Sequence, residues 1–247
     1  MTELNNSFPI IKSPHDSRDW IFNDKTLSFP SEVDYRDSLT DVRNQGTIGS
    51  CFAMSSCCMK EYQERLDYNF QDYFSPKFFY RQRQNQGEGM YGRDVMRILK
   101  DIGVCYESSC PYVDVNDEYD FDTHLEEAKQ HVISHYARVD DLRSLIHAIA
   151  ENGVCLITVP VYRKDGRMWK KNNKDEKRRG GHAMAVVGYS MQEGHLIIRN
   201  SWGDSWEDKG YCYFPFEDWG LHYEFWTTVD DDSKIERLKD KKCCVVS

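Results

Sequence analysis

The interpretation of this chain of 247 residues starts from the stretch Gln45-Gly46-Thr47-Ile48-Gly49-Ser50-Cys51-Phe52-Ala53. Two more stretches belong with it, Gly180-Gly181-His182-Ala183 and Arg199-Asn200-Ser201-Trp202-Gly203. His182 lies 131 residues after Cys51, and Asn200 lies 149 residues after it. A thiol, an imidazole and an orienting amide are groups that nucleophilic catalysis combines. Their order and spacing are far more specific than any one of them alone.

Each element by itself has an ordinary interpretation. A free cysteine is commonly a small buried hydrophobe, a lone histidine is usually structural, and Asn200-Ser201-Trp202-Gly203 alone would be a loop. Together with Gln45 they resemble the papain family of cysteine peptidases, over about residues 30–229. Residues 13–19 and 74–80 look more like the bacterial and viral branch of that family than like the lysosomal cathepsins.

The resemblance implies an α+β fold of the papain-like two-lobe type. A helical lobe over about residues 40–115 would face an antiparallel, barrel-like sheet lobe over about 116–230, with the active-site cleft between them. Residues 1–29 precede this catalytic unit of residues 30–230, as a short propeptide, as an inhibitory strap across the cleft, or as a surface segment. Residues 231–247 form a basic tail.

The resemblance also implies a role for each site residue. Cys51 is the nucleophile at a helix N-terminus, His182 carries the proton, Asn200 orients the imidazole, and Gln45 completes the oxyanion hole with the Cys51 N–H. Cys51 and His182 are expected to rest as thiolate and imidazolium. The resemblance assigns supporting roles to Gly49, Ser50, Trp202 and Trp206, and substrate contacts to Gly89, Met90 and Ala183.

Local patterns predict the main elements around these residues. Apolar spacing predicts a helix from Cys51 to about Leu66, Ser75-Pro76 opens a second helix, and Gly92–Ile102 forms a third that ends at Gly103. In the second half, residues 141–152 fit a helix and residues 154–161 a buried strand. Residues 182–190 and 195–200 fit a hairpin. The hairpin should bring His182 and Asn200 towards the same end of its two strands.

Composition limits the class of protein. Hydrophobic residues make up 40% and the net charge is −9, which fits a packed globular protein and disfavours a general nucleic-acid binder. No secretory signal or membrane-spanning run is visible, so we expect a cytoplasmic monomer whose nine cysteines are free thiols. Secreted relatives carry a structural cysteine at the position of Ile48. No cofactor or metal is expected, because the pair His131 and His135 lacks a third ligand.

Two charged segments leave alternatives open. Residues 163–179 carry nine Lys and Arg against three Asp and Glu, either as a solvated loop or as a basic wall beside the site that favours acidic peptides or an anionic surface. At the C-terminus, Cys244-Val245-Val246-Ser247 fits a prenylation box, and Cys243 could take a second acyl chain to anchor the protein to membranes. An accidental tail is the alternative.

These features predict a cysteine endopeptidase that acts on peptide or protein substrates without a cofactor. Acyl transfer to an amine other than water is an alternative reaction of the same acyl-enzyme. An alternative of a different class is a catalytically silent peptide-binding protein, tethered to membranes by its tail. Loss or retention of the biological effect on removing the Cys51 thiol distinguishes these classes.

Overall fold

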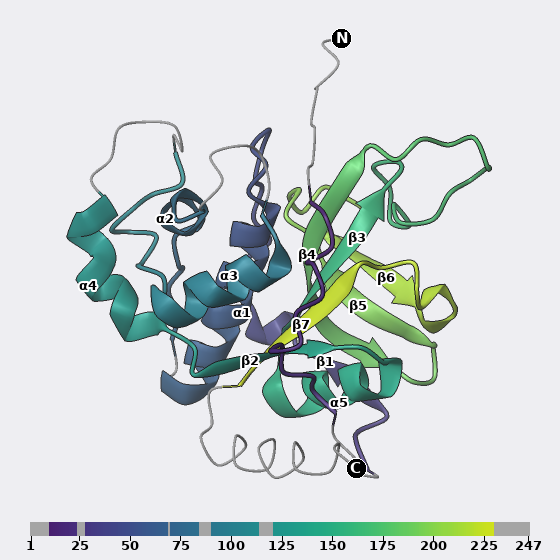
Figure 1. The fold of residues 1–247 in the computed structure, drawn as a ribbon, viewed down its shortest axis with the longest axis horizontal. Coiled ribbons are helices and arrows are strands. Elements are labelled where there is room, and N and C mark those ends of the chain that lie inside the picture. Colours follow the sequence, from purple (N-terminus) through teal and green to yellow (C-terminus); the bar gives the residue numbers. More distant parts are fainter. Residues whose placement is uncertain (1–9, 24–27, 69, 84–89, 114–120, 230–247) are drawn as a thin grey trace.

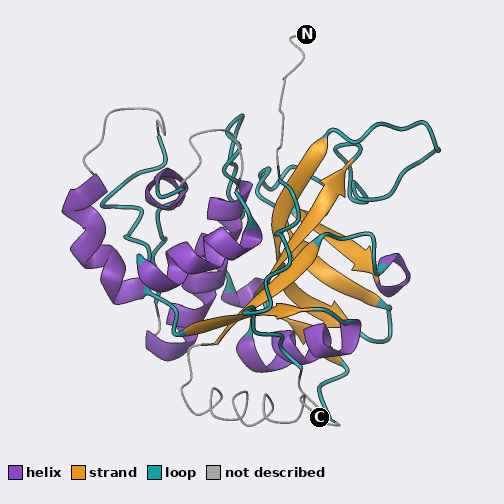
Figure 2. Ribbon diagram, viewed as in Figure 1, coloured by secondary structure: helices purple, strands orange, loops and turns teal. Residues whose placement is uncertain are grey.

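The computed structural model describes residues 10–23, 28–68, 70–83, 90–113 and 121–229. It consists of a helical part and a sheet part that lie side by side (Figures 1 and 2). The α+β fold predicted from the sequence is confirmed. The predictions for Gly89, Cys243 and Cys244 fall outside the described residues.

The helical part is built around α1 (Cys51–Tyr68), with α2 (Pro76–Arg81), α3 (Gly92–Asp101) and the short α4 (Leu125–Ala128) beside it. The start of α2 follows the predicted chemistry, because Pro76 occupies its first turn and the Ser75 side chain accepts a hydrogen bond from the Phe78 N–H. Short 3-10 turns flank α4 at Phe121–His124 and Lys129–His131. All three predicted helices of the first half are confirmed.

The helical part extends beyond the predicted boundary near residue 115. After α3, Gly103 has φ +83, and a β-carbon there would lie 2.0 Å from the Ala128 carbonyl oxygen. The Glu127 carboxylate accepts a hydrogen bond from Ser109 Oγ at 3.1 Å. Residues 121–131 therefore pack on the helical part, because the glycine lets the two segments approach closely.

Within the residues that the structure describes, the sheet part has seven strands, and every pair of these strands is antiparallel. Its order is β2-β7-β3-β4-β5-β6, with β1 paired to β4, so that β2 and β6 are edges and the described strands form an open sheet rather than a closed barrel. The strands are β1 (Glu32–Asp34), β2 (His135–Val139), β3 (Cys155–Val161), β4 (Gly180–Ser190), β5 (His195–Arg199), β6 (Tyr211–Pro215) and β7 (Glu224–Val229).

Alternating residues of β4 join two hydrophobic cores. Ala183, Ala185 and Val187 belong to the core shared with α1, α2 and α3. Met184 and Val186 belong to a second core, which α5 (Leu142–Asn152) covers. Side chains of a strand point alternately to its two faces, and the small alanines let α1 pack closely on β4. The strand that carries His182 is thereby held on both sides.

The N-terminal segment 10–23 is packed along the boundary between the two parts (Figure 1). Asp19 forms an ion pair of 2.5 Å with Arg93 of α3, and both side chains are buried. Phe22 is buried in the second core, and Ser13 Oγ donates to the Glu224 carboxylate at 3.0 Å. This segment therefore connects the two parts of the molecule.

In the part of the chain that the structure describes, none of the helices combines the length and the hydrophobicity that a membrane span requires. No group of three or more His, Cys, Asp or Glu side chains in the described ranges could hold a metal ion. Seven cysteines in these ranges are free and buried.

Candidate active site

Cys51 is the first residue of α1 and its side chain is only 1% exposed. The N–H groups of Cys51, Phe52 and Ala183 stabilise a thiolate at this position, but burial is the larger effect and raises the pKa of the thiol to about 11. The contact with Ala183 is decisive for the geometry, because Ala183 follows His182 in β4. Packing of α1 on β4 thus brings the thiol to the strand that carries the imidazole.

His182 lies in β4, opposite Val159 of β3, and is fully buried. Its Nε2 lies 2.7 Å from Asn200 Oδ1. A carbonyl oxygen can only accept, so Nε2 carries the hydrogen and Nδ1 is the nitrogen available to the thiol. The His182 ring also packs on Trp202 at 4.6 Å between centroids, and Trp202 meets Trp206 edge-on at 5.4 Å. These indoles shield the His182–Asn200 hydrogen bond from water.

Burial lowers the pKa of His182 to about 4, against a smaller opposing effect from Asn200. The raised pKa of Cys51 and the lowered pKa of His182 both disfavour the charged forms. With the two side chains buried, the structure favours a neutral thiol and a neutral imidazole. The sequence predicted a resting thiolate and imidazolium. The difference arises because a helix N-terminus and a neighbouring imidazole outweigh desolvation only where water reaches the pair.

Asn200 is held at the end of β5 by its backbone and its side chain. The Asn200 N–H donates to the Gly210 carbonyl at 2.9 Å, and Asn200 Oδ1 accepts a second hydrogen bond from the Ser201 N–H at 2.8 Å. β4 and β5 pair directly, with Ala185 opposite Arg199. The predicted hairpin therefore accounts for the meeting of His182 and Asn200.

Gln45 is 1% exposed and its side-chain amide is fixed at both ends. Nε2 donates to the Ile48 carbonyl at 2.7 Å, and Oε1 accepts from Ser201 Oγ at 2.6 Å. The amide nitrogen carries a second N–H, which is the group that an oxyanion requires. The sequence motif that contains Ser201 gave no indication of this contact. The structure shows that the Ser201 hydroxyl orients the Gln45 amide.

Tyr112 is a second residue of the site that sequence reasoning missed. Its hydroxyl lies 2.6 Å from Ser50 Oγ and donates to the Gln45 carbonyl at 3.1 Å. Burial raises the pKa of Tyr112 to about 12, so the hydroxyl keeps its proton at neutral pH. It holds the loop that connects Gln45 to Cys51. Proline before tyrosine at 111–112 was the only local signal.

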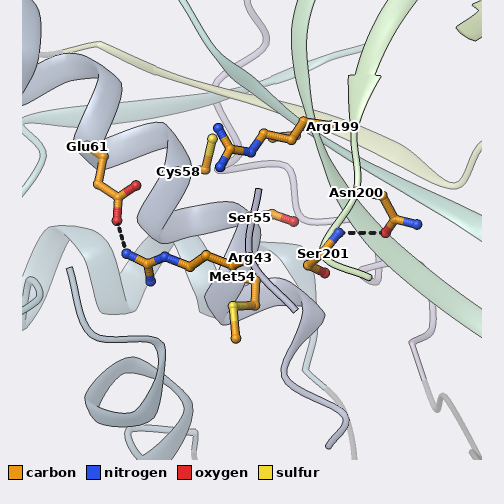
Figure 3. Close-up of a pocket in the computed structure, with 9 residues that line it drawn as sticks. Arg43, Met54, Ser55, Cys58, Glu61, Arg199, Asn200 and Ser201 are labelled. Carbon is orange, nitrogen blue, oxygen red and sulfur yellow. Dashed lines mark hydrogen bonds and ion pairs between the residues drawn. The ribbon is translucent and has the colours of Figure 1, made fainter. Parts of the chain in front are cut away.

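Asn200 and several charged side chains line a cavity of about 20 Å³, and Figure 3 shows the Arg43–Glu61 ion pair among the lining residues. Arg43 Nη2 and Glu61 Oε1 are 2.6 Å apart, and Arg199 donates to the Thr40 carbonyl at 2.7 Å. The cavity is about the size of one water molecule, so it is not the substrate cleft. These contacts connect α1, residues 40–43 and the end of β5.

Of the predicted substrate contacts, Met90 and Ala183 are buried in the same hydrophobic cluster as Cys51. Ile10 belongs to that cluster too and is 4% exposed. A β-carbon on Gly181 would lie 2.5 Å from the Ile10 carbonyl oxygen, so Ile10 rests directly on the residue before His182. The N-terminal segment thus occupies space beside the candidate catalytic pair.

Sequence comparison finds relatives of this chain among known proteins. The chain is 28% identical to cathepsin K of Mus musculus over 74% of its own length and 59% of the relative. It is 26% identical to papain of Carica papaya, over 77% of this chain and 56% of papain. The chain thus spans less than two thirds of the length of these relatives.

Solved structures show the same fold. Xylellain, a cysteine protease from Xylella fastidiosa, superposes with a TM-score of 0.80 at 24% identity, covering 92% of this chain and 97% of xylellain. Digestive procathepsin L 3 of Tenebrio molitor gives a TM-score of 0.70 at 19% identity, covering 92% of this chain and 77% of that one. A sequence profile described as papain family cysteine protease matches residues 29–218. The chain therefore belongs to the papain family of cysteine proteases.

Proposed function

We propose that this protein is a cysteine endopeptidase that hydrolyses peptide bonds through a covalent acyl-enzyme on Cys51. The observation that carries the proposal is the 2.7 Å hydrogen bond between His182 and Asn200. His182 lies in β4, and the next residue of that strand, Ala183, contacts the Cys51 thiol. Membership of the papain family supports the same activity. A nucleophile, a proton carrier and an orienting group are thus present together.

The reaction follows from the orientation of these groups. Once the site is open, Nδ1 of His182 takes the Cys51 proton, and the thiolate attacks the substrate carbonyl. The developing oxyanion accepts from the Cys51 N–H and the second N–H of the Gln45 amide. His182 then protonates the leaving amine as the thioester forms. In the second half, His182 takes a proton from water, and the resulting hydroxide hydrolyses the thioester and restores the thiol.

Hydrolysis of a fluorogenic peptide library under reducing conditions tests this proposal. We expect the wild-type chain to cleave, Cys51→Ala to be inactive, and Asn200→Ala to retain a reduced rate. A folded wild-type protein that neither cleaves peptides nor reacts with thiol-directed inhibitors contradicts the proposal. It would favour the silent peptide-binding alternative, in which Cys51→Ala keeps its affinity for peptides. Product masses with added amines separate hydrolysis from acyl transfer.

We also propose that residues 10–13 act as an inhibitory strap. Ile10 contacts the Gly181 backbone, while Cys51 is 1% exposed and His182 is fully buried. A peptide substrate needs access to both, so residues that cover the backbone beside His182 have to move first. Ser13 anchors this stretch through Glu224, which keeps the motion local.

Membrane anchoring through the tail is a separate proposal that rests on the sequence of residues 243–247. We propose that Cys244 is farnesylated where the chain is expressed in a eukaryotic cell, which would move the protein from the cytoplasm to membranes. Incorporation of a labelled isoprenoid that is lost in Cys244→Ser tests it. Absence of label from the wild-type chain in such cells contradicts it.

A further inference from the structure

The basic segment 163–179 begins and ends beside the candidate active site. It connects β3 to β4, and the register pairs Val161 with Gly180 and Val159 with His182. Arg179 N–H donates to the Val161 carbonyl at 2.7 Å, which closes the base of the loop. The loop therefore emerges from the same end of the hairpin that holds the imidazole, and it extends outward from there (Figure 1).

Ion pairs fix the base of the loop, because three of its cations have carboxylate partners within the loop or in Asp218. Arg163 forms an ion pair with Asp165 and another, of 3.5 Å, with Glu176. Asp218, which is buried, accepts from Arg167 Nη2 at 2.6 Å and from Lys170 Nζ at 3.1 Å. These pairs use Asp165 and Glu176, two of the three carboxylates of the segment.

The remaining cations of the loop face solvent. Six of its nine basic residues are exposed, and no carboxylate of the described residues forms an ion pair with them: Lys164, Lys171, Lys174, Lys177, Arg178 and Arg179. The chain as a whole has a net charge of −9, so this concentration of positive charge runs against its overall balance. A local positive field attracts negatively charged ligands.

The start of the loop is the part that acts on the catalytic centre. The Gly166 N–H donates a hydrogen bond to the Glu207 carboxylate at 2.9 Å, so the loop contacts the turn that follows Trp206. The loop therefore lies on the side of His182 where Trp202 and Trp206 pack. Met90, Ala183 and Ile10 belong instead to the hydrophobic cluster that contains Cys51. Burial is the main reason that the pKa of His182 is lowered, and the positive charge of Lys164 lowers it further.

We propose that the exposed cations of residues 163–179, led by Lys164, form a binding surface for acidic side chains of the peptide substrate. This inference rests on the proposed peptidase function and deepens it. A peptide that crosses Cys51 and passes over Trp202 continues towards the loop, where Asp or Glu side chains would meet Lys164. The preference is therefore expected on one side of the cut bond only.

Matched peptides test the surface. Two fluorogenic series differ only by Asp or Asn, placed at each position on either side of the cleavage site, and kcat/KM is measured at low salt. Exposed ion pairs change binding by about two- to five-fold each, so we expect an Asp to Asn ratio of that size on one side. The ratio should fall in Lys164→Gln, fall further in Lys164→Glu, and shrink in high salt, while the other exposed cations of the loop retain part of the preference. Lys100→Gln, an exposed lysine on α3, is the control and should leave the ratio unchanged.

The outcomes separate this inference from the proposed function. If neither series is cleaved, the peptidase proposal fails, and the basic surface is then judged by the affinity of the Cys51→Ala protein for Asp-rich against Asn-rich peptides. Equal ratios and equal affinities in the wild-type and Lys164 proteins overturn the inference. Loss of binding to phosphatidylserine vesicles in Lys164→Glu, with unchanged peptide ratios, overturns it as well and assigns the loop to a membrane surface.

Discussion

Ile10→Ala should activate the protein. Ile10 is 4% exposed and rests on Gly181, whereas the adjacent Ile11 is 57% exposed. Replacement by alanine keeps the backbone contact with Gly181 but removes three carbons from the buried cluster that Ile10 shares with Cys51, which is worth about 2.4 kcal/mol at ~0.8 kcal/mol per buried methylene. If the strap is closed nearly all the time, the open population rises by up to about 60-fold. Ile11→Ala is the matched control and should change the rate by less than about two-fold.

Two assays report the opening independently. The first is kcat/KM for a fluorogenic peptide under reducing conditions, and the second is the rate of Cys51 alkylation by iodoacetamide, which needs no peptide. The covered thiol has a pKa raised by burial to about 11, so alkylation of the wild-type chain should rise steeply above neutral pH. In Ile10→Ala the alkylation profile should move to lower pH, because water then reaches the thiol.

A point substitution tests the strap more sharply than deletion of residues 1–28, which would leave a chain that begins at residue 29. Truncation would also remove the buried Asp19–Arg93 ion pair and the core residue Phe22, and so would confuse opening with unfolding. Unfolding midpoints of both variants should therefore be measured in parallel. Equal hydrolysis and equal alkylation rates in Ile10→Ala and Ile11→Ala, with folding intact, would refute the strap.

Three further predictions concern the supports of the site. Tyr112→Phe removes the hydroxyl that contacts Ser50 and the Gln45 carbonyl. We expect kcat to fall about ten-fold and KM to change less than two-fold. An unchanged rate of Cys51 alkylation shows that the fold is intact. Gly103→Ala should lower the free energy of unfolding by more than about 2 kcal/mol in urea titration, because φ is +83 and its β-carbon meets a carbonyl; a neutral effect contradicts this. Burial lowers the pKa of His182 from about 6.5 to about 4, so its neutral form contributes about 3 kcal/mol of stability that is present above pH 6.5 and lost as the pH falls towards 4. His182→Gln should lack this acid dependence between pH 6.5 and 4, and identical profiles in the two proteins would contradict it.

Local sequence determined much of the architecture. Ser75-Pro76 starts α2 and Gly103 follows α3, because helix caps and breakers act within a few residues. The spacing of Cys51, His182 and Asn200 indicated the family, and the hairpin of β4 and β5 explains how the last two meet. Signals of this kind can be read from a few neighbouring residues. The motifs around Cys51, His182 and Asn200 are also short, and each can be recognised by itself.

Only the tertiary structure decided how the site is supported and covered. Ser201 meets Gln45 across 156 residues of chain, Tyr112 meets it across 67, and Ile10 reaches Gly181 from the other end of the sequence. None of these contacts has a periodicity or a spacing that could be read along the chain. The neutral state of Cys51 likewise could not be read from the sequence. The motif indicates a reactive thiol, but its pKa depends on how much water the packed lobes and the N-terminal segment exclude, and that is a property of the whole fold.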